Sequence, residues 1–139
     1  MALYKTVLVT GASAGFGFAI CEKLASQGYK VIATARRQDK LDALANKYEG
    51  QIFPLKLDVT DTEAVDSILD KLPDEFKNID VLVNNAGICN DMILDFKTYD
   101  DFKKVIDVNL NGTFLVTKYI SKLMKSGSIV NISSTNGID

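Results

Sequence analysis

Short apolar runs that alternate with longer amphipathic stretches constrain the fold of this chain more than any other feature. Continuous apolar runs predict buried strands near residues 6–10, 30–34, 52–57, 79–83 and 128–132. Pro54 interrupts the third run, which favours a position near a sheet edge. Strands separated by helices form right-handed βαβ units and a parallel sheet. We therefore predict an α/β fold, a doubly wound parallel sheet of strand order 3-2-1-4-5 that stops after the fifth strand.

The stretches between the predicted strands carry helix signals. Helices are predicted over about residues 15–27 and 41–48, each followed by a glycine. Thr60 to Glu63 has the spacing of a capping box, with an apolar helix face behind it. A second cap opens a long helix over about residues 98–125, in which Asn111-Gly112 suggests a local bend.

Composition narrows the class of protein. The 139 residues are enough for one domain, and 47% apolar with 24% charged residues is average for a globular protein. A net charge of −2 gives no support to nucleic-acid or anionic-membrane binding. Histidine is absent, which excludes histidine metal sites and Ser-His-Asp catalysis, and no metal site is predicted.

Cellular location is predicted from the cysteines and the apolar runs. Cys21 and Cys89 form no CxxC pair, and we expect two reduced thiols rather than a disulfide. No apolar run approaches the roughly 20 residues of a membrane span. A strand begins within a few residues of Met1, leaving no room for a signal peptide. We therefore expect a cytoplasmic protein without a membrane partner.

A glycine-rich loop follows the first predicted strand and opens the first helix. Its spacing is G-x3-G-x-G, with Gly11 for a tight turn, Gly15 for close approach of a diphosphate and Gly17 for close helix packing. The N-terminus of the helix offers free N–H groups and partial positive charge to phosphates. This context predicts a Rossmann-like dinucleotide-binding domain that covers residues 1–139; a plain strand–helix turn is the alternative.

The end of the second predicted strand indicates which dinucleotide is bound. NAD sites usually carry an acidic residue there, whereas this sequence has Ala35-Arg36-Arg37. Arginine binds a 2′-phosphate through charge-assisted hydrogen bonds, and the Ser13 hydroxyl adds a possible donor. NADP is therefore favoured over NAD. In the alternative interpretation both arginines are simply solvated.

Three further motifs complete a pattern with the glycine loop. They are Leu57-Asp58-Val59-Thr60, Asn84-Asn85-Ala86-Gly87 and the stretch from Gly127 to Ser134, each at the end of a predicted strand. In this order and spacing the chain resembles the N-terminal half of the short-chain dehydrogenase/reductase family. Gly15-Phe16-Gly17 is similar to NADP-dependent 3-hydroxy acid dehydrogenases, and residues 107–113 are more similar to 3-oxoacyl-carrier-protein reductases. The substrate class stays open.

The resemblance implies roles for individual residues. Asp58 would bind the adenine with Val59 beside it, Ser134 would hold the substrate oxygen, and Asn109 would hold a water of the proton relay. Alternatively, Asp58 is a strand-end turn residue and Asn109 an ordinary polar helix residue. The expected cofactor-binding residues are Gly11, Ser13, Gly15, Phe16, Gly17, Arg36, Arg37, Asp58, Val59, Asn85, Ala86 and Gly87.

The sequence departs from the family pattern at its C-terminus. The family's proton donor is the tyrosine of Tyr-x-x-x-Lys, a dozen or so residues after the active serine, and this sequence stops at Asp139. We expect no tyrosine present here to substitute. The predicted function is NADP-dependent hydride transfer with a small carbonyl or alcohol substrate, present as an N-terminal portion that is inactive alone. A non-catalytic NADP-binding or dimerising module is the alternative.

The predicted long helix bears on association. Its apolar residues spread over more than one face, which predicts low stability or self-association for these residues alone. In full-length members this helix and the next one form the usual dimer contact, so the resemblance implies a homo-oligomer.

Overall fold

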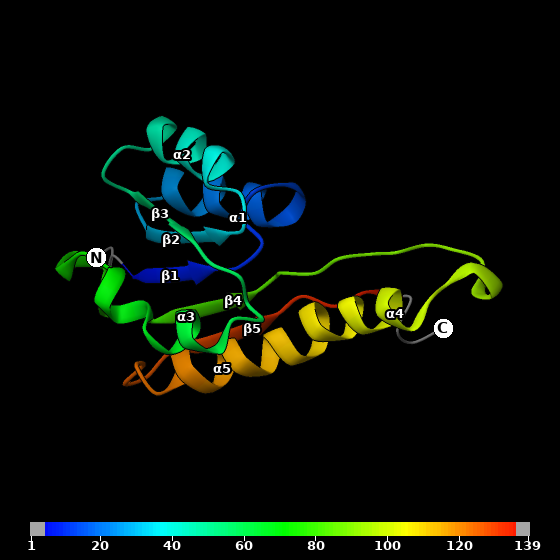
Figure 1. Ribbon diagram of the computed structural model, residues 1–139. Helices are drawn as coiled ribbons and strands as arrows, with labels where there is room; N and C mark the ends of the chain where they lie inside the picture. The colour runs from blue at the N-terminus through cyan, green and yellow to red at the C-terminus, as the bar shows by residue number, and fades with distance from the viewer. Residues whose placement is uncertain (1–4, 136–139) are drawn as a thin grey trace.

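A five-stranded parallel sheet of order β3-β2-β1-β4-β5 organises the computed structural model, which describes residues 5–135 (Figure 1). The predicted fold class and strand order are confirmed. The strands are β1 (Thr6–Val9), β2 (Lys30–Ala35), β3 (Ile52–Lys56), β4 (Val81–Asn84) and β5 (Ser128–Asn131).

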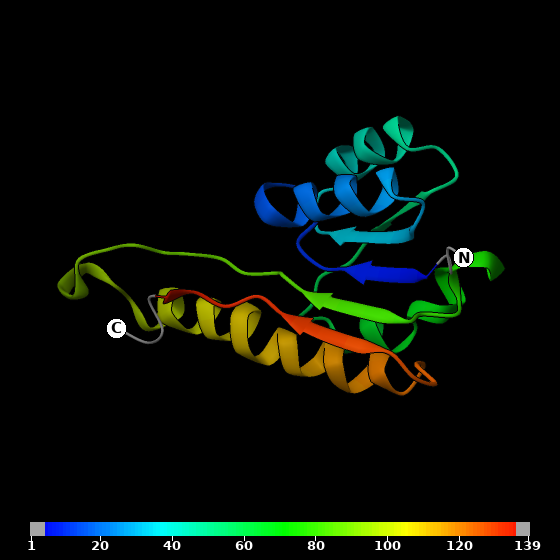
Figure 2. The ribbon, with the colours of Figure 1, turned by 180° about the vertical axis from the view of Figure 1, so that it is seen from behind.

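Helices cover both faces of the sheet. On one face lie α1 (Gly15–Ser26) and α2 (Gln38–Lys47), and on the other α3 (Thr62–Asp66) and α5 (Thr113–Ser121). α4 (Tyr99–Ile106) precedes α5 in the same long helix and extends beyond the ends of the strands (Figures 1 and 2). Two hydrophobic clusters fill the two interfaces. In β1, Leu8 belongs to one cluster and its neighbours Val7 and Val9 to the other. Alternate side chains thus face opposite layers, so both must be apolar, which explains the continuous apolar runs.

The first predicted capping box, Thr60 to Glu63, is wrong. Asp61 is the N-cap of α3, and its Oδ1 accepts from the amide of Ala64 at 3.1 Å. The Thr60 hydroxyl instead donates to Oδ1 of Asp58 at 2.7 Å. The Asp61 carboxylate therefore caps the N-terminus of α3, and the Thr60 hydroxyl bonds within the turn after β3 instead. Beyond α3 the predicted helix continues only as 3-10 turns, at Ile68–Lys71 and Asp74–Phe76.

The second predicted cap is confirmed. The Thr98 hydroxyl accepts from the amide of Asp101 at 3.1 Å, and the Asp101 carboxylate accepts from the amide of Thr98 at 3.0 Å. The helix runs through α4, a π-helical segment at Asp107–Gly112 and α5 (Figure 2). The irregular segment lies where Asn111-Gly112 suggested a bend. The helix ends at Ser121, earlier than expected.

The connection between β4 and α4 extends away from the sheet (Figures 1 and 2). It contains the 3-10 turn Leu94–Phe96, and the side chains of Ile93, Leu94 and Phe96 are exposed. Within residues 5–135, no helix is long and apolar enough to cross a membrane. The same part of the chain holds no group of three or more cysteine and acidic side chains suited to a metal ion.

Candidate cofactor cleft

A cleft of about 380 Å³ opens at the carboxyl ends of β1, β2, β3 and β4. Every predicted cofactor-binding residue lines it except Gly15 and Gly17, which lie in the first turn of the adjoining helix α1. Sequence reasoning missed further lining residues, although most of them directly adjoin predicted ones. These are Ala14, Ala35, Leu57, Ile88 and Val108.

The glycines of the loop meet different steric demands. Gly11 and Gly15 have φ of +66° and +59°, a conformation that side-chain-bearing residues seldom adopt. A Cβ on Gly15 would meet nothing within 4 Å, so the backbone there borders open space. A Cβ on Gly17 would overlap the carbonyl oxygen of Gly11 and Nδ2 of Asn85. Gly15 thus leaves room for a ligand, whereas Gly17 allows α1 to pack closely.

The first turn of α1 presents backbone donors beside the cleft. Its N-cap is Ala14, which makes no side-chain cap, and the turn contains no acidic residue. The N–H groups of a first helical turn have no partner within the helix, and the helix dipole adds partial positive charge. Such a terminus suits an anionic ligand such as a diphosphate.

Hydrogen bonds from the start of the β4–α4 connection fix the loop. The Thr10 hydroxyl accepts from the amides of Asn85 and Ala86 at 3.0 and 2.9 Å. Nδ2 of Asn85 donates to the carbonyl oxygens of Thr10 and Gly11 at 3.2 Å each. The two walls of the cleft are therefore held together by paired polar contacts.

Arg36 and Arg37 follow β2 directly and lie exposed at the edge of the cleft. Nη2 of Arg37 donates to Oδ2 of Asp39 at 3.1 Å, and this bond lowers the pKa of the Asp39 carboxyl. Both side chains are more than 60% exposed, so the pair is weak and exchangeable. Two cations and no acidic side chain at the end of β2 suit a phosphorylated ribose.

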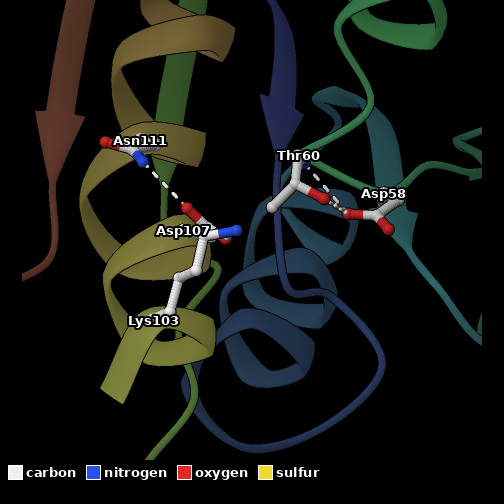
Figure 3. A network of polar contacts seen from close by, with 5 residues as sticks. All are labelled: Asp58, Thr60, Lys103, Asp107 and Asn111. Atoms are coloured by element: carbon white, nitrogen blue, oxygen red, sulfur yellow. Dashed lines mark hydrogen bonds and ion pairs between the residues drawn. The ribbon is translucent and has the colours of Figure 1, made fainter. Parts of the chain in front are cut away.

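Asp58 lines the cleft one residue before Val59 and is held by its own turn. Its Oδ1 accepts from the amide and hydroxyl of Thr60 at 2.9 and 2.7 Å (Figure 3). Burial raises the pKa of the Asp58 carboxyl, but the Thr60 bonds and the charge of Arg36 outweigh burial and leave the pKa below its usual value. A fixed, ionised acceptor suits an amino group of a ligand.

Comparisons with known proteins agree with this geometry. The family model described as short chain dehydrogenase matches residues 5–139. The chain belongs to the short-chain dehydrogenase family. NADP-dependent 3-hydroxy acid dehydrogenase YdfG of Escherichia coli K12 is 42% identical over 135 residues, which are 94% of this chain and 54% of that protein. 3-Oxoacyl-(acyl-carrier-protein) reductase FabG of Thermotoga maritima is 40% identical over 140 residues, covering 96% and 57%.

A solved structure extends the likeness to three dimensions. The closed form of serine dehydrogenase complexed with NADP+ superimposes with a TM-score of 0.92 at 40% identity, covering 96% of this chain and 56% of that one. This short-chain dehydrogenase chain spans about half the length of the curated relatives it matches.

The predicted catalytic residues of this short-chain dehydrogenase lie outside the lining of the cleft. Oδ1 of Asn109 accepts from the Ile88 amide at 2.8 Å, and Nδ2 donates to the Ile88 carbonyl at 3.0 Å. Asn109 therefore clamps a peptide that does line the cleft. Ser134 is exposed and follows β5 at the same edge of the sheet.

A buried amide joins the helix that follows the segment of Asn109 to the strand that precedes Ser134. Nδ2 of Asn84, at the end of β4, donates to Oγ1 of Thr117 in α5 and Oδ1 of Asn131 in β5, both at 2.9 Å. These bonds fix the helix and the strand against the strand that leads into the cleft.

The Tyr-x-x-x-Lys spacing of short-chain dehydrogenases does occur in this sequence, at Tyr99 and Lys103. The pair lies in α4, before Ser134 in the chain rather than after it, and neither residue lines the cleft. Tyr99 is 74% exposed, and Nζ of Lys103 stands 3.9 Å from Oδ2 of Asp107 (Figure 3). Tyr99 is therefore not placed to donate a proton at the cleft, although its spacing to Lys103 matches the family pattern. Tyr4 and Asp139 lie outside the described residues.

Proposed function

We propose that this chain forms the cofactor-binding part of a NADP(H)-dependent oxidoreductase that interconverts a carbonyl and an alcohol. The observation that carries the proposal is the cleft itself, where an uncapped helix start, a glycine loop and two arginines converge. Relatives whose names specify NADP support the choice of cofactor.

The residues of the cleft fit the parts of NADP(H). The first turn of α1 would bind the diphosphate through backbone N–H groups, with Gly15 leaving space for it. Arg36 and Arg37 would bind the 2′-phosphate. The Asp58 carboxylate would accept from the adenine amino group, with Val59 packed beside the ring. When bound, NADPH supplies the hydride and NADP+ accepts one.

Ser134 and Asn109 would act on the substrate side. The Ser134 hydroxyl would hold the substrate oxygen and stabilise charge there. Asn109 orders the Ile88 peptide and would hold a water of the proton relay. The 139 residues contain no tyrosine–lysine pair after Ser134. We expect these residues alone to bind NADP(H) without turnover, because no general acid reaches the substrate oxygen. Carbonyl-dependent oxidation of NADPH by the isolated chain would contradict this.

A second candidate is a non-catalytic NADP-binding module that dimerises. The observation in its favour is an exposed apolar face on the long helix, where Phe102, Leu110 and Phe114 are 54%, 62% and 63% exposed. Such a face favours association with another surface. Binding of NADPH by a stable dimer of this chain, with no hydride transfer to any carbonyl tested, would support this candidate.

Fluorescence titration of the chain with NADPH and NADH tests the proposed function. NADPH is expected to bind more tightly. Changing both Arg36 and Arg37 to alanine should weaken NADPH binding by about 1–3 kcal/mol, roughly 5- to 150-fold, and leave NADH binding unchanged. The control is Lys122→Ala with Lys125→Ala. It removes two exposed charges that follow the carboxyl end of α5 and do not line the cleft. Absence of NADPH binding, or an unchanged preference in the arginine variant, would overturn the proposal.

A further inference from the structure

The π-helical segment Asp107–Gly112 contacts the cleft through three of its residues. Val108 lines the cleft directly. The Asn109 side chain holds the Ile88 peptide, which also lines it. Gly112 lies against Val59, the residue proposed to pack beside the adenine. π-Helical turns occur frequently at functional sites.

Position 112 requires glycine because the Val59 side chain lies against it, and not because of its backbone conformation. It is buried, and its φ and ψ of −61° and −44° are ordinary helical values that any residue adopts. A Cβ on Gly112 would stand 2.6 Å from Cγ2 and 3.2 Å from Cβ of Val59. Both distances are shorter than ordinary carbon–carbon contact. The lack of a side chain therefore creates a socket for Val59.

Val59 cannot yield to a side chain at position 112 by a simple rotation. Valine is branched at Cβ, which leaves it few χ1 conformations, and its side chain is 7% exposed within the core. Relief of an overlap would have to move the Val59 backbone or the helix that carries Gly112, and either movement alters the wall of the cleft. The Val59 backbone continues directly into Asp58, whose carboxylate accepts two hydrogen bonds from Thr60 in the same turn. A shift of Val59 would therefore displace the whole adenine end of the cleft.

We infer that Gly112 is a positioning residue for cofactor binding: by leaving a socket for Val59 it fixes the Asp58–Val59 turn against the long helix and sets the adenine end of the cleft. This inference rests on the proposed function. One short helical segment then supports two residues that line the cleft, because Asn109 holds Ile88 and Gly112, three residues further on, receives Val59.

Three variants test the inference, with adenosine 2′,5′-bisphosphate as the probe because it carries only the adenine end of NADP. Gly112→Ala should weaken binding of the probe at least tenfold in calorimetric titration. Val59→Ala removes both Cγ atoms and should weaken binding less. The double variant, Gly112→Ala with Val59→Ala, should bind nearly like Val59→Ala alone, because the 2.6 Å overlap with Cγ2 is gone and only the milder 3.2 Å contact with Cβ of residue 59 remains. Leu110→Ala alters an exposed side chain of the same segment and should bind like the wild type.

The melting temperature of Gly112→Ala shows whether the contact between Gly112 and Val59 matters for the fold. Alanine normally favours a helix over glycine, so Gly112→Ala should raise the melting temperature unless the socket matters. We expect the melting temperature of Gly112→Ala to fall below that of the wild type. The double variant should melt close to Val59→Ala alone. If Gly112→Ala does not fold, a folded double variant that binds like Val59→Ala supports the inference, and an unfolded one overturns it.

The remaining outcomes distinguish this inference from the proposed function. A wild-type chain that does not bind the probe overturns both. A wild-type chain that binds, together with a Gly112→Ala variant that binds equally well, overturns the role of Gly112 and leaves the proposed function standing. Weakened binding that removal of the Val59 Cγ atoms does not restore also overturns the role of Gly112.

Discussion

Asn85 and Thr10 hold each other across the cleft through both backbone and side chain. The Asn85 amide donates to the Thr10 hydroxyl at 3.0 Å, and Asn85 Nδ2 donates to the Thr10 carbonyl oxygen at 3.2 Å. Thr10 ends the run from β1, and Asn85 follows β4 immediately. These bonds join the glycine loop to the opposite wall, so the shape of the cleft depends on them.

Replacing Thr10 with valine should destabilise the protein by about 1–3 kcal/mol, since two part-buried backbone amides lose their acceptor. Valine keeps the shape of threonine but lacks the hydroxyl that accepts from the amides of Asn85 and Ala86. Urea unfolding measures the change as a lower midpoint at constant slope. Thr34→Val is the control, because the Thr34 hydroxyl is equally buried but makes one bond, to the Val9 carbonyl at 3.0 Å. A Thr10 variant as stable as the Thr34 variant would contradict this account.

Alanine at Gly15 and at Gly17 should have different consequences. Gly15→Ala places a residue with a side chain at positive φ, which costs about 1 kcal/mol of stability, and its methyl group obstructs the diphosphate. We expect NADPH affinity to fall on the order of tenfold or more with the fold retained. Gly17→Ala overlaps the Gly11 carbonyl and Asn85, so it should cost about 3 kcal/mol of stability. Denaturant titration and NADPH titration of both variants measure the two effects. The pattern fails if Gly17→Ala proves the more stable variant.

The sequence was sufficient to predict where the site lies, but not how its parts are fixed. Strand ends in a parallel sheet converge on one edge, so motifs after β1, β2, β3 and β4 had to meet there. Which residue caps α3 was predicted wrongly, because Thr60 and Asp61 are both good N-cap residues and only tertiary placement decides between them. The clamp between Asn109 and Ile88 and the socket of Gly112 join segments far apart in sequence, and no local pattern encodes them.

Asn109→Ala should speed hydrogen exchange at the Ile88 amide about five- to tenfold, because it removes both hydrogen bonds to that peptide at about 1 kcal/mol in all. Exchange measured by NMR at the neighbouring Val83 amide, inside β4, should stay unchanged. Asn109→Asp is the matched comparison. Its carboxylate accepts from the Ile88 amide but cannot donate to the Ile88 carbonyl, so an intermediate rate is expected. Equal Ile88 rates in all three proteins would show that the clamp does not limit local opening.

Cys21 should make the protein lose stability in alkali. The thiol is fully buried in α1, and burial raises its pKa to about 12. Unfolding restores an ordinary thiol pKa of about 8.5, so above that pH the unfolded chain loses a proton that the folded chain keeps. Stability is therefore intact below about pH 8.5 and declines as the pH rises further. Between pH 7 and 10 the free energy of unfolding should fall by about 2 kcal/mol more in the wild type than in Cys21→Ala.

The comparison with Cys21→Ala isolates this thiol, because the two proteins differ at this position alone and both carry the exposed Cys89. Denaturant unfolding at several pH values supplies the measurement, with the slope against pH as the readout rather than the absolute loss from the cavity. A thiol reagent at pH 8 gives an independent check: it should modify Cys89 rapidly and Cys21 only after unfolding. Parallel pH profiles for the two proteins, or rapid modification of both thiols, would mean that α1 does not shield Cys21 from water.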